Sequence, residues 1–167
     1  MSKRAEILAR RIAEGHRKLI DYIEAHPETA WYTYCPNEQR SVGVVVHHVA
    51  NVLPGELEMI RTVAAGRPVT GMTSETLDEM NAVHALEYAD CTREETLDLL
   101  RRNSAHVVNA VREMSDEELD RAAPVSLHAD APVTAQYLIE DHPLGHAYGH
   151  LVSIRAALEG EGKPEHE

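Results

Sequence analysis

Apolar residues recur every three or four positions along most of the chain, a spacing that places them on one face of an α-helix. One such stretch runs from about Ser2 to Ala25. A second begins at Ser41, a residue type that caps helix N-termini, and ends at residues 66–68. The β-branched run from Val44 to Val46 also suits a strand, but the apolar period continues well past the length of a typical strand. The pattern therefore predicts two long helices at the start of the chain.

Two further helices are predicted in the middle of the chain, from about Glu75 to Ala89 and from Thr92 to Met114. The second of these opens with Thr92 and Glu95, residue types that together form a capping box at a helix N-terminus. Ser115 begins another capping box, which predicts a short helical turn as far as about Asp120.

The last helix is expected from Thr134 to Leu158, with Pro143 inside it. Residues 26–40 and 122–132 contain prolines and lack the helical period, so both segments are expected to be loops. Residues 160–167 are polar and are expected to form a disordered tail. Four long helices with these connections indicate an all-α fold, a four-helix bundle that forms a single domain over residues 1–159.

The chain carries 16 Lys and Arg against 28 Asp and Glu, which gives a formal net charge of −12. This charge argues against nucleic acid or an anionic membrane surface as a partner, because both require basic patches. The sequence has no run of about 18 apolar residues, so we expect no membrane-spanning segment. Two cysteines, Cys35 and Cys91, are too few for a disulfide framework, and we expect reduced thiols in a cytoplasmic protein.

Histidine is the residue type that points to chemistry, with 11 in the chain. His142, His146 and His150 follow one another at intervals of four in the last predicted helix. This interval puts side chains on one helical face, where two imidazoles can reach the same metal ion. Gly145 and Gly149 lie beside them and suggest that space is needed there, because glycine is unfavourable inside a helix.

A third ligand has to come from another helix, and the second predicted helix offers two adjacent histidines. At about 100° per residue, His48 flanks the apolar centre of that helix, whereas His47 points nearly the opposite way. The centre is formed by Val45, Val49 and Val52. We therefore expect His48 to reach into the bundle and His47 to face solvent or a partner.

A purely structural interpretation competes with the metal site. A single His at the edge of a core is usually a hydrogen-bonded support, and His-x-x-x-His spacing also arises by chance on surfaces. Burying three imidazoles without a metal or polar partners would be costly, however. The residues alone leave both interpretations open.

Two motifs resemble those of the DinB/YfiT-like superfamily of metalloenzymes. The segment Ser41-Val42-Gly43-Val44-Val45-Val46-His47-His48-Val49 is similar to that family's helix-two signature, in which S-V-G-x-x-x-x-H supplies a metal ligand. His146-Ala147-Tyr148-Gly149-His150 is similar to the H-x-x-x-H of its last helix. The likeness extends to the middle helices over residues 77–119 and covers most of residues 5–158.

The resemblance implies a four-helix bundle with a histidine triad that binds a divalent metal, most often zinc or nickel. It places the ligands on His48, His146 and His150. The sequence departs from the family around these ligands, at Arg40, at Val44 and at residues 151–152, where the family often has Trp, an acidic residue and Gly-Gln. These differences concern the substrate pocket rather than the triad.

The resemblance also implies an enzyme that acts on a small molecule, since three histidines leave a coordination position open. Some relatives resemble transferases that use a low-molecular-weight thiol for S-transfer, and others resemble hydrolases. The residues expected around such a pocket are His142, Asn81, His84 and Tyr148, with Asp141 beside them. Pro143 disfavours α geometry at His142, so His142 is a pocket candidate rather than an assigned ligand.

Two other functions remain as alternatives. One is a non-catalytic bundle that binds metal or a protein partner while keeping the three histidines. The other is a carboxylate-bridged di-iron bundle, which requires Glu-x-x-His motifs that this sequence lacks. The resemblance also allows a homodimer, in which His47 on the outer face of the second helix would join the interface.

Overall fold

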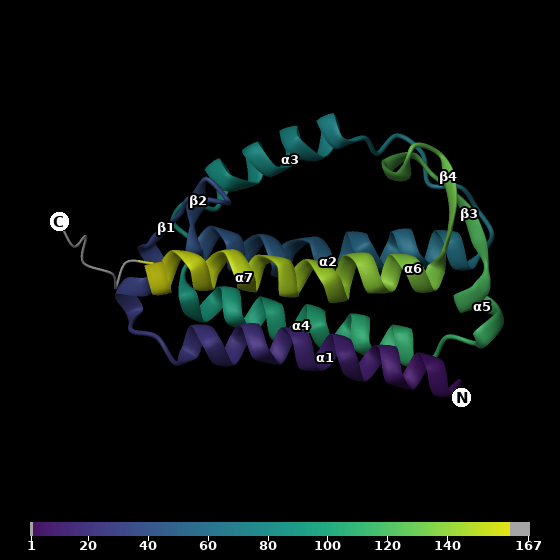
Figure 1. The fold of residues 1–167 in the computed structure, drawn as a ribbon, viewed down its shortest axis with the longest axis horizontal. Coiled ribbons are helices and arrows are strands. Elements are labelled where there is room, and N and C mark those ends of the chain that lie inside the picture. The colour runs from purple at the N-terminus through teal and green to yellow at the C-terminus, as the bar shows by residue number, and fades with distance from the viewer. Residues whose placement is uncertain (1, 161–167) are drawn as a thin grey trace.

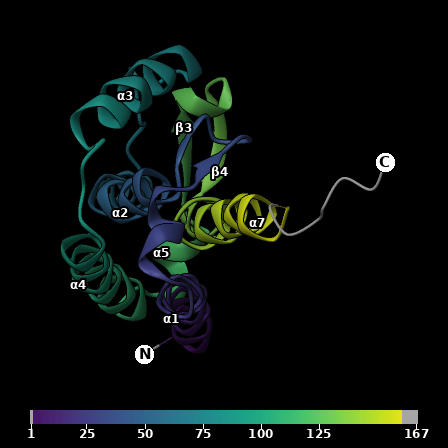
Figure 2. The same cartoon turned by 90° about the vertical axis from the view of Figure 1, so that its left-hand side faces the viewer.

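The computed structural model describes residues 2–160 and contains four long helical rods that lie side by side (Figure 1). The rods are α1 (Lys3–Glu24), α2 (Val42–Ala64), α4 (Arg93–Arg112) and a last rod composed of α6 (Ala135–Ile139), η3 (Glu140–Leu144) and α7 (Gly145–Gly160). Both α1 and α2 pack against α4 and against the last rod. They therefore occupy opposite corners of the bundle, as the end-on view shows (Figure 2). The predicted four-helix bundle is confirmed.

Apolar side chains from all four rods meet along the bundle axis and form its core. Ile12, Leu53, Leu100 and Ile154, one from each rod, are fully buried. Burying one such side chain stabilises a fold by about 1.5–3 kcal/mol relative to leaving it in water. The helices begin where the sequence indicated, because the hydroxyls of the residues at their starts accept hydrogen bonds from the first turn. These caps are Ser2, Ser41, Thr92, Ser115 and Thr134.

A fifth helix, α3 (Ser74–Glu87), lies outside the bundle and runs along the outer side of α2 (Figures 1 and 2). Its apolar side chains Met80, Val83 and Leu86 are exposed, and His84 is its one buried residue. The side of α3 that faces α2 therefore buries a histidine rather than a stripe of apolar residues.

The two predicted loops contain short secondary structure, which the sequence analysis missed. In the first, η1 (Glu28–Tyr32) precedes a hairpin of β1 (Tyr34–Cys35) and β2 (Arg40–Ser41). The second follows α5 (Asp116–Asp120) and holds an antiparallel hairpin of β3 (Ala122–Val125) and β4 (Ala131–Thr134), joined through η2 (Ser126–His128). Strands of two residues, and strands of four residues that contain proline, give almost no period-2 signal.

The last rod is not a continuous α-helix, because Glu140–Leu144 forms a π-helical turn that contains Pro143. Gly145 follows, and a β-carbon there would lie 2.9 Å from the Glu140 carbonyl oxygen. The wider turn thus accounts for Gly145, while a β-carbon at Gly149 would meet nothing within 4 Å. The expectation that both glycines leave room for the histidines was wrong for Gly145, whose neighbour is backbone.

The ends of the chain complete this description. Gly160 is the last residue of α7 rather than the first residue of a tail, and the remainder of the predicted disordered tail, residues 161–167, lies outside the described residues. None of the helices in the described part of the chain is both long enough and apolar enough to cross a membrane.

Candidate metal centre

Three imidazoles from two rods meet inside the bundle. His48 comes from α2, and His146 and His150 come from successive turns of α7. One ligand atom of each lies within 4.8 Å of the others, and the Nε2 atoms of His48 and His146 are 3.2 Å apart. His48 is buried with 6% of its surface exposed, and the other two are partly buried. The structure therefore brings together the three histidines that the sequence singled out.

Two of these imidazoles are hydrogen-bonded to carboxylates through their Nδ1 atoms. The Nδ1 of His146 lies 2.9 Å from Oε1 of Glu56, and the Nδ1 of His150 lies 2.9 Å from Oε1 of Glu38. A carboxylate only accepts hydrogen bonds, so Nδ1 carries the proton in each ring and Nε2 keeps its lone pair. Such carboxylate–histidine pairs fix ring orientation and raise ligand basicity at metal sites.

The sequence analysis did not identify Glu38 or Glu56. Glu56 follows His48 by eight residues, about two helical turns, so both lie on one face of α2. A charged residue within an otherwise apolar stripe was the signal available. Glu38 lies in the turn between β1 and β2, a position that helical spacing does not reveal.

The residues present fit a divalent metal ion. The Nε2 of His150 is buried and lacks a hydrogen-bond partner among residues 2–160, which is uncommon for a buried polar atom. The facing Nε2 atoms of His48 and His146 can share only one proton between them, whereas a metal cation could accept lone pairs from all three rings. A donor set of three imidazole nitrogens with an open fourth position is typical of catalytic zinc sites.

The electrostatics of the cluster keep His48 in its ligand form. Burial, together with the nearby His146 and His150, lowers the pKa of His48 to about 2, so the ring is neutral at pH 7. For Glu38, burial acts to raise the pKa, but the hydrogen bond and charge of His150 outweigh it and lower the pKa to about 2. A neutral His48 ring is the protonation state that a metal ligand needs.

The predicted placement of His47 was wrong. His47 is buried, with 7% of its surface exposed. Its Nδ1 lies 2.9 Å from Nε2 of His84, and its ring stacks on Tyr88. The wheel of α2 places His47 away from the bundle correctly, but α3 covers that side.

His84 is the pocket candidate that α3 brings close to the triad. Its ring meets the His48 ring edge-on, with centroids 5.5 Å apart. Burial and the neighbouring His47 lower the pKa of His84 to about 4, and its Nδ1 is buried without a hydrogen-bond partner among the described residues. Asn81, one turn earlier on α3, is partly buried.

The other two pocket candidates are not part of the triad cluster. Tyr148 packs against α1, where its ring contacts Gly15 and lies 5.5 Å from the Lys18 ammonium. Its place midway between His146 and His150 in sequence puts it on the opposite side of α7. His142 gathers with His128 and Asp141 in a separate group of potential ligands.

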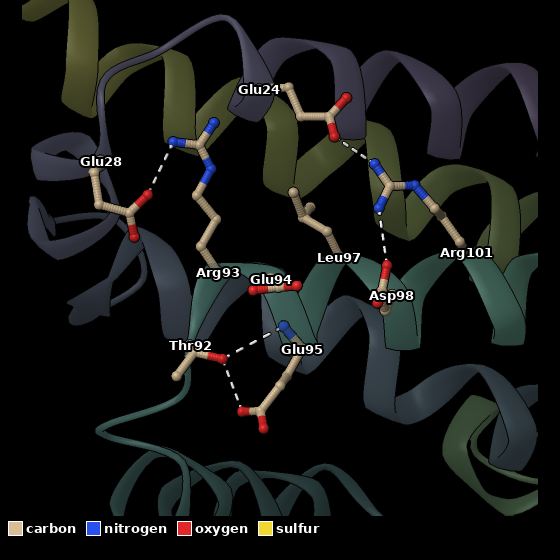
Figure 3. A pocket seen from close by; sticks show the side chains of 9 residues that line it. All are labelled: Glu24, Glu28, Thr92, Arg93, Glu94, Glu95, Leu97, Asp98 and Arg101. Carbon is tan, nitrogen blue, oxygen red and sulfur yellow. Dashed lines mark hydrogen bonds and ion pairs between the residues drawn. The ribbon is translucent and has the colours of Figure 1, made fainter.

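A surface cleft of about 730 Å³ lies elsewhere, between the end of α1 and the start of α4 (Figure 3). Arg93 pairs there with Glu28, and Arg101 pairs with Glu24 and Asp98. No predicted site residue lines this cleft, and both of its arginines are already paired with carboxylates. The chemistry that the sequence pointed to is therefore at the histidine cluster.

Comparison with known proteins supports the fold. No family model matches the chain, and no curated protein matches it in sequence. The structure is similar to that of YfiT from Bacillus subtilis, described as a probable metal-dependent hydrolase with an unusual four-helix bundle topology. The TM-score is 0.76 at 17% sequence identity, and the match covers 98% of this chain and 91% of YfiT. The chain therefore has the DinB/YfiT-like four-helix bundle fold.

Proposed function

We propose that the chain is a divalent-metal-dependent hydrolase of a small molecule, with His48, His146 and His150 as the metal ligands. The observation that carries this proposal is the convergence of three imidazoles, two of them held through Nδ1 by buried or partly buried carboxylates. The description of YfiT as a probable metal-dependent hydrolase supports the reaction class. Imidazole donors suit zinc and nickel.

Each residue around the cluster has a distinct task in this proposal. Glu56 and Glu38 orient His146 and His150 and keep a proton on their Nδ1 atoms, so that Nε2 is available. When bound, the divalent ion supplies Lewis acidity that activates a water molecule or thiol as a nucleophile near neutral pH.

His84 is the residue best placed to move a proton beside the ligands. It is neutral at pH 7 because its pKa is about 4. The tautomer that donates from Nε2 to His47 leaves the lone pair of Nδ1 free to accept a proton or a substrate N–H. Since His84 is buried on the inner side of α3 with its ring against that of His48, we infer a substrate small enough to pass between α3 and α2.

The test is a hydrolysis screen on untagged, chelator-treated protein reloaded with zinc or nickel, using small esters, amides and phosphoesters. We expect activity in the wild type and in His106→Ala, which removes an exposed histidine of α4. His146→Ala should lose activity and one equivalent of metal while keeping its helix content. Activity that persists in His146→Ala would contradict the proposal. Conjugation of a low-molecular-weight thiol without hydrolysis would assign the site to S-transfer instead.

A further inference from the structure

A second group of metal-binding side chains lies next to the triad. His128, Asp141 and His142 each offer a ligand atom within 4.8 Å of the others. The Asp141 carboxylate oxygen Oδ2 lies 3.7 Å from Nε2 of His142 and 3.9 Å from Nε2 of His128. Both distances exceed a hydrogen bond, so these contacts leave the nitrogens unsatisfied.

Both imidazole nitrogens of this group are buried. The Nε2 atoms of His128 and His142 have no hydrogen-bond partner among residues 2–160. Buried polar atoms are nearly always paired, and here two of them approach the same carboxylate oxygen. We infer that His128, Asp141 and His142 form a second site for a divalent transition-metal ion.

Two irregular backbone segments create this grouping. The π-helical turn Glu140–Leu144 carries Asp141 and His142, and π turns often occur at functional sites. The β3–β4 hairpin supplies His128 at the end of η2, where Ala129 and Asp130 follow with positive φ angles of 55° and 57°. Together these segments bring three ligands from two parts of the chain to one point.

The donor set indicates the class of ion. Two imidazoles and one carboxylate suit borderline transition metals such as zinc, cobalt or iron(II). Calcium and magnesium prefer oxygen donors alone, so neither fits this group. Three protein ligands also leave coordination positions open.

Glu56 lies between the two groups. Its Oε1 is 2.9 Å from Nδ1 of His146 and 4.0 Å from Nδ1 of His142, and its Oε2 is buried without a partner among the described residues. One carboxylate thus faces an imidazole of each site. The ligand sets do not overlap, so the second site does not depend on the proposed function of the first.

Cobalt(II) is the probe for the test. Untagged, chelator-treated protein is titrated with Co²⁺ and followed by visible absorption and calorimetry. We expect two equivalents to bind the wild type and the His106→Ala control. His128→Ala and Asp141→Asn should each lose one equivalent, and His146→Ala should lose the other.

The variants separate failure of this inference from failure of the proposed function. A single equivalent in the wild type that survives Asp141→Asn and disappears in His146→Ala would overturn the second site and leave the first standing. A single equivalent lost in Asp141→Asn but kept in His146→Ala would support the second site and overturn the triad. Asp141→Asn is isosteric and changes an exposed side chain, so its result does not rest on altered folding.

Discussion

Glu56 is a carboxylate buried in the middle of α2, eight residues after His48. It accepts a hydrogen bond from His146 and lies near His142. Removing its charge while keeping its shape separates its electrostatic role from its packing.

For Glu56→Gln we expect zinc affinity at the triad to fall by about 10- to 100-fold, because the amide no longer supports the basicity of His146. Competition with a chromophoric chelator measures the zinc affinity. Glu58→Gln, an exposed neighbour on α2, is the matched control and should bind as the parent does. Both variants are made in an Asp141→Asn background, so that only zinc binding at the triad is measured. Equal affinities in the two variants would show that Glu56 does not act on the metal.

At the scale of elements, the π-helical turn and α3 are the features that position the site. Substitutions at Gly145 and Gly149 test the role of the π-helical turn, because an added β-carbon would have different surroundings at the two positions. At Gly145 it would meet the Glu140 carbonyl, and at Gly149 it would enter open space.

We expect Gly145→Ala to lower the free energy of unfolding by about 1–3 kcal/mol, as overpacking does. Gly149→Ala should raise it by about 0.5–1 kcal/mol, since alanine favours the helix and nothing obstructs it. Urea unfolding followed by circular dichroism compares the two. If Gly145→Ala is as stable as Gly149→Ala, the close approach to Glu140 is not a constraint.

The same two elements mark what the sequence could and could not reveal. Helical spacing was enough to predict the rods and to turn His48 toward the histidines of the last rod, because the bundle obeys that period, and the family resemblance then singled out His146 and His150. Helical spacing failed for His47 because α3 covers that side of α2 without an apolar stripe that would reveal the contact. Met80, Val83 and Leu86 of α3 are exposed, and only His84 is buried. Helical spacing also failed at Pro143, because a proline in a helical pattern does not distinguish a kink from a π turn.

At the scale of the whole molecule, burial of many histidines ties stability to pH. Burial lowers the pKa values of His16, His48, His84 and His142. Below the ordinary value of 6.5 the unfolded chain therefore binds more protons than the folded one. The stabilisation is fully present above pH 6.5 and is lost as the pH falls toward the folded-state values.

His16 provides the test, because it joins three rods and is not itself one of the proposed metal ligands. Its Nδ1 is 2.7 Å from the Ser104 hydroxyl and its Nε2 is 2.9 Å from the Pro143 carbonyl. We expect the free energy of unfolding of metal-free protein to fall below pH 6.5, with each such imidazole contributing about 1.4 kcal/mol per pH unit. In His16→Gln, whose amide can make both hydrogen bonds, the slope should be shallower by about that amount. An unchanged slope would assign the pH dependence to other groups.

The opposite corners held by α1 and α2 have a consequence for synthesis on the ribosome. The packing partners of α1 are α4 and the last rod, and α4 begins only at Arg93, while α1 ends at Glu24. At about 5–20 residues per second, roughly 3–14 s pass before the start of α4 has been translated. During that interval the apolar face of α1, including Ile12 and Leu19, has no native partner helix. The nascent chain therefore passes through a period in which it offers chaperones an uncovered amphipathic helix.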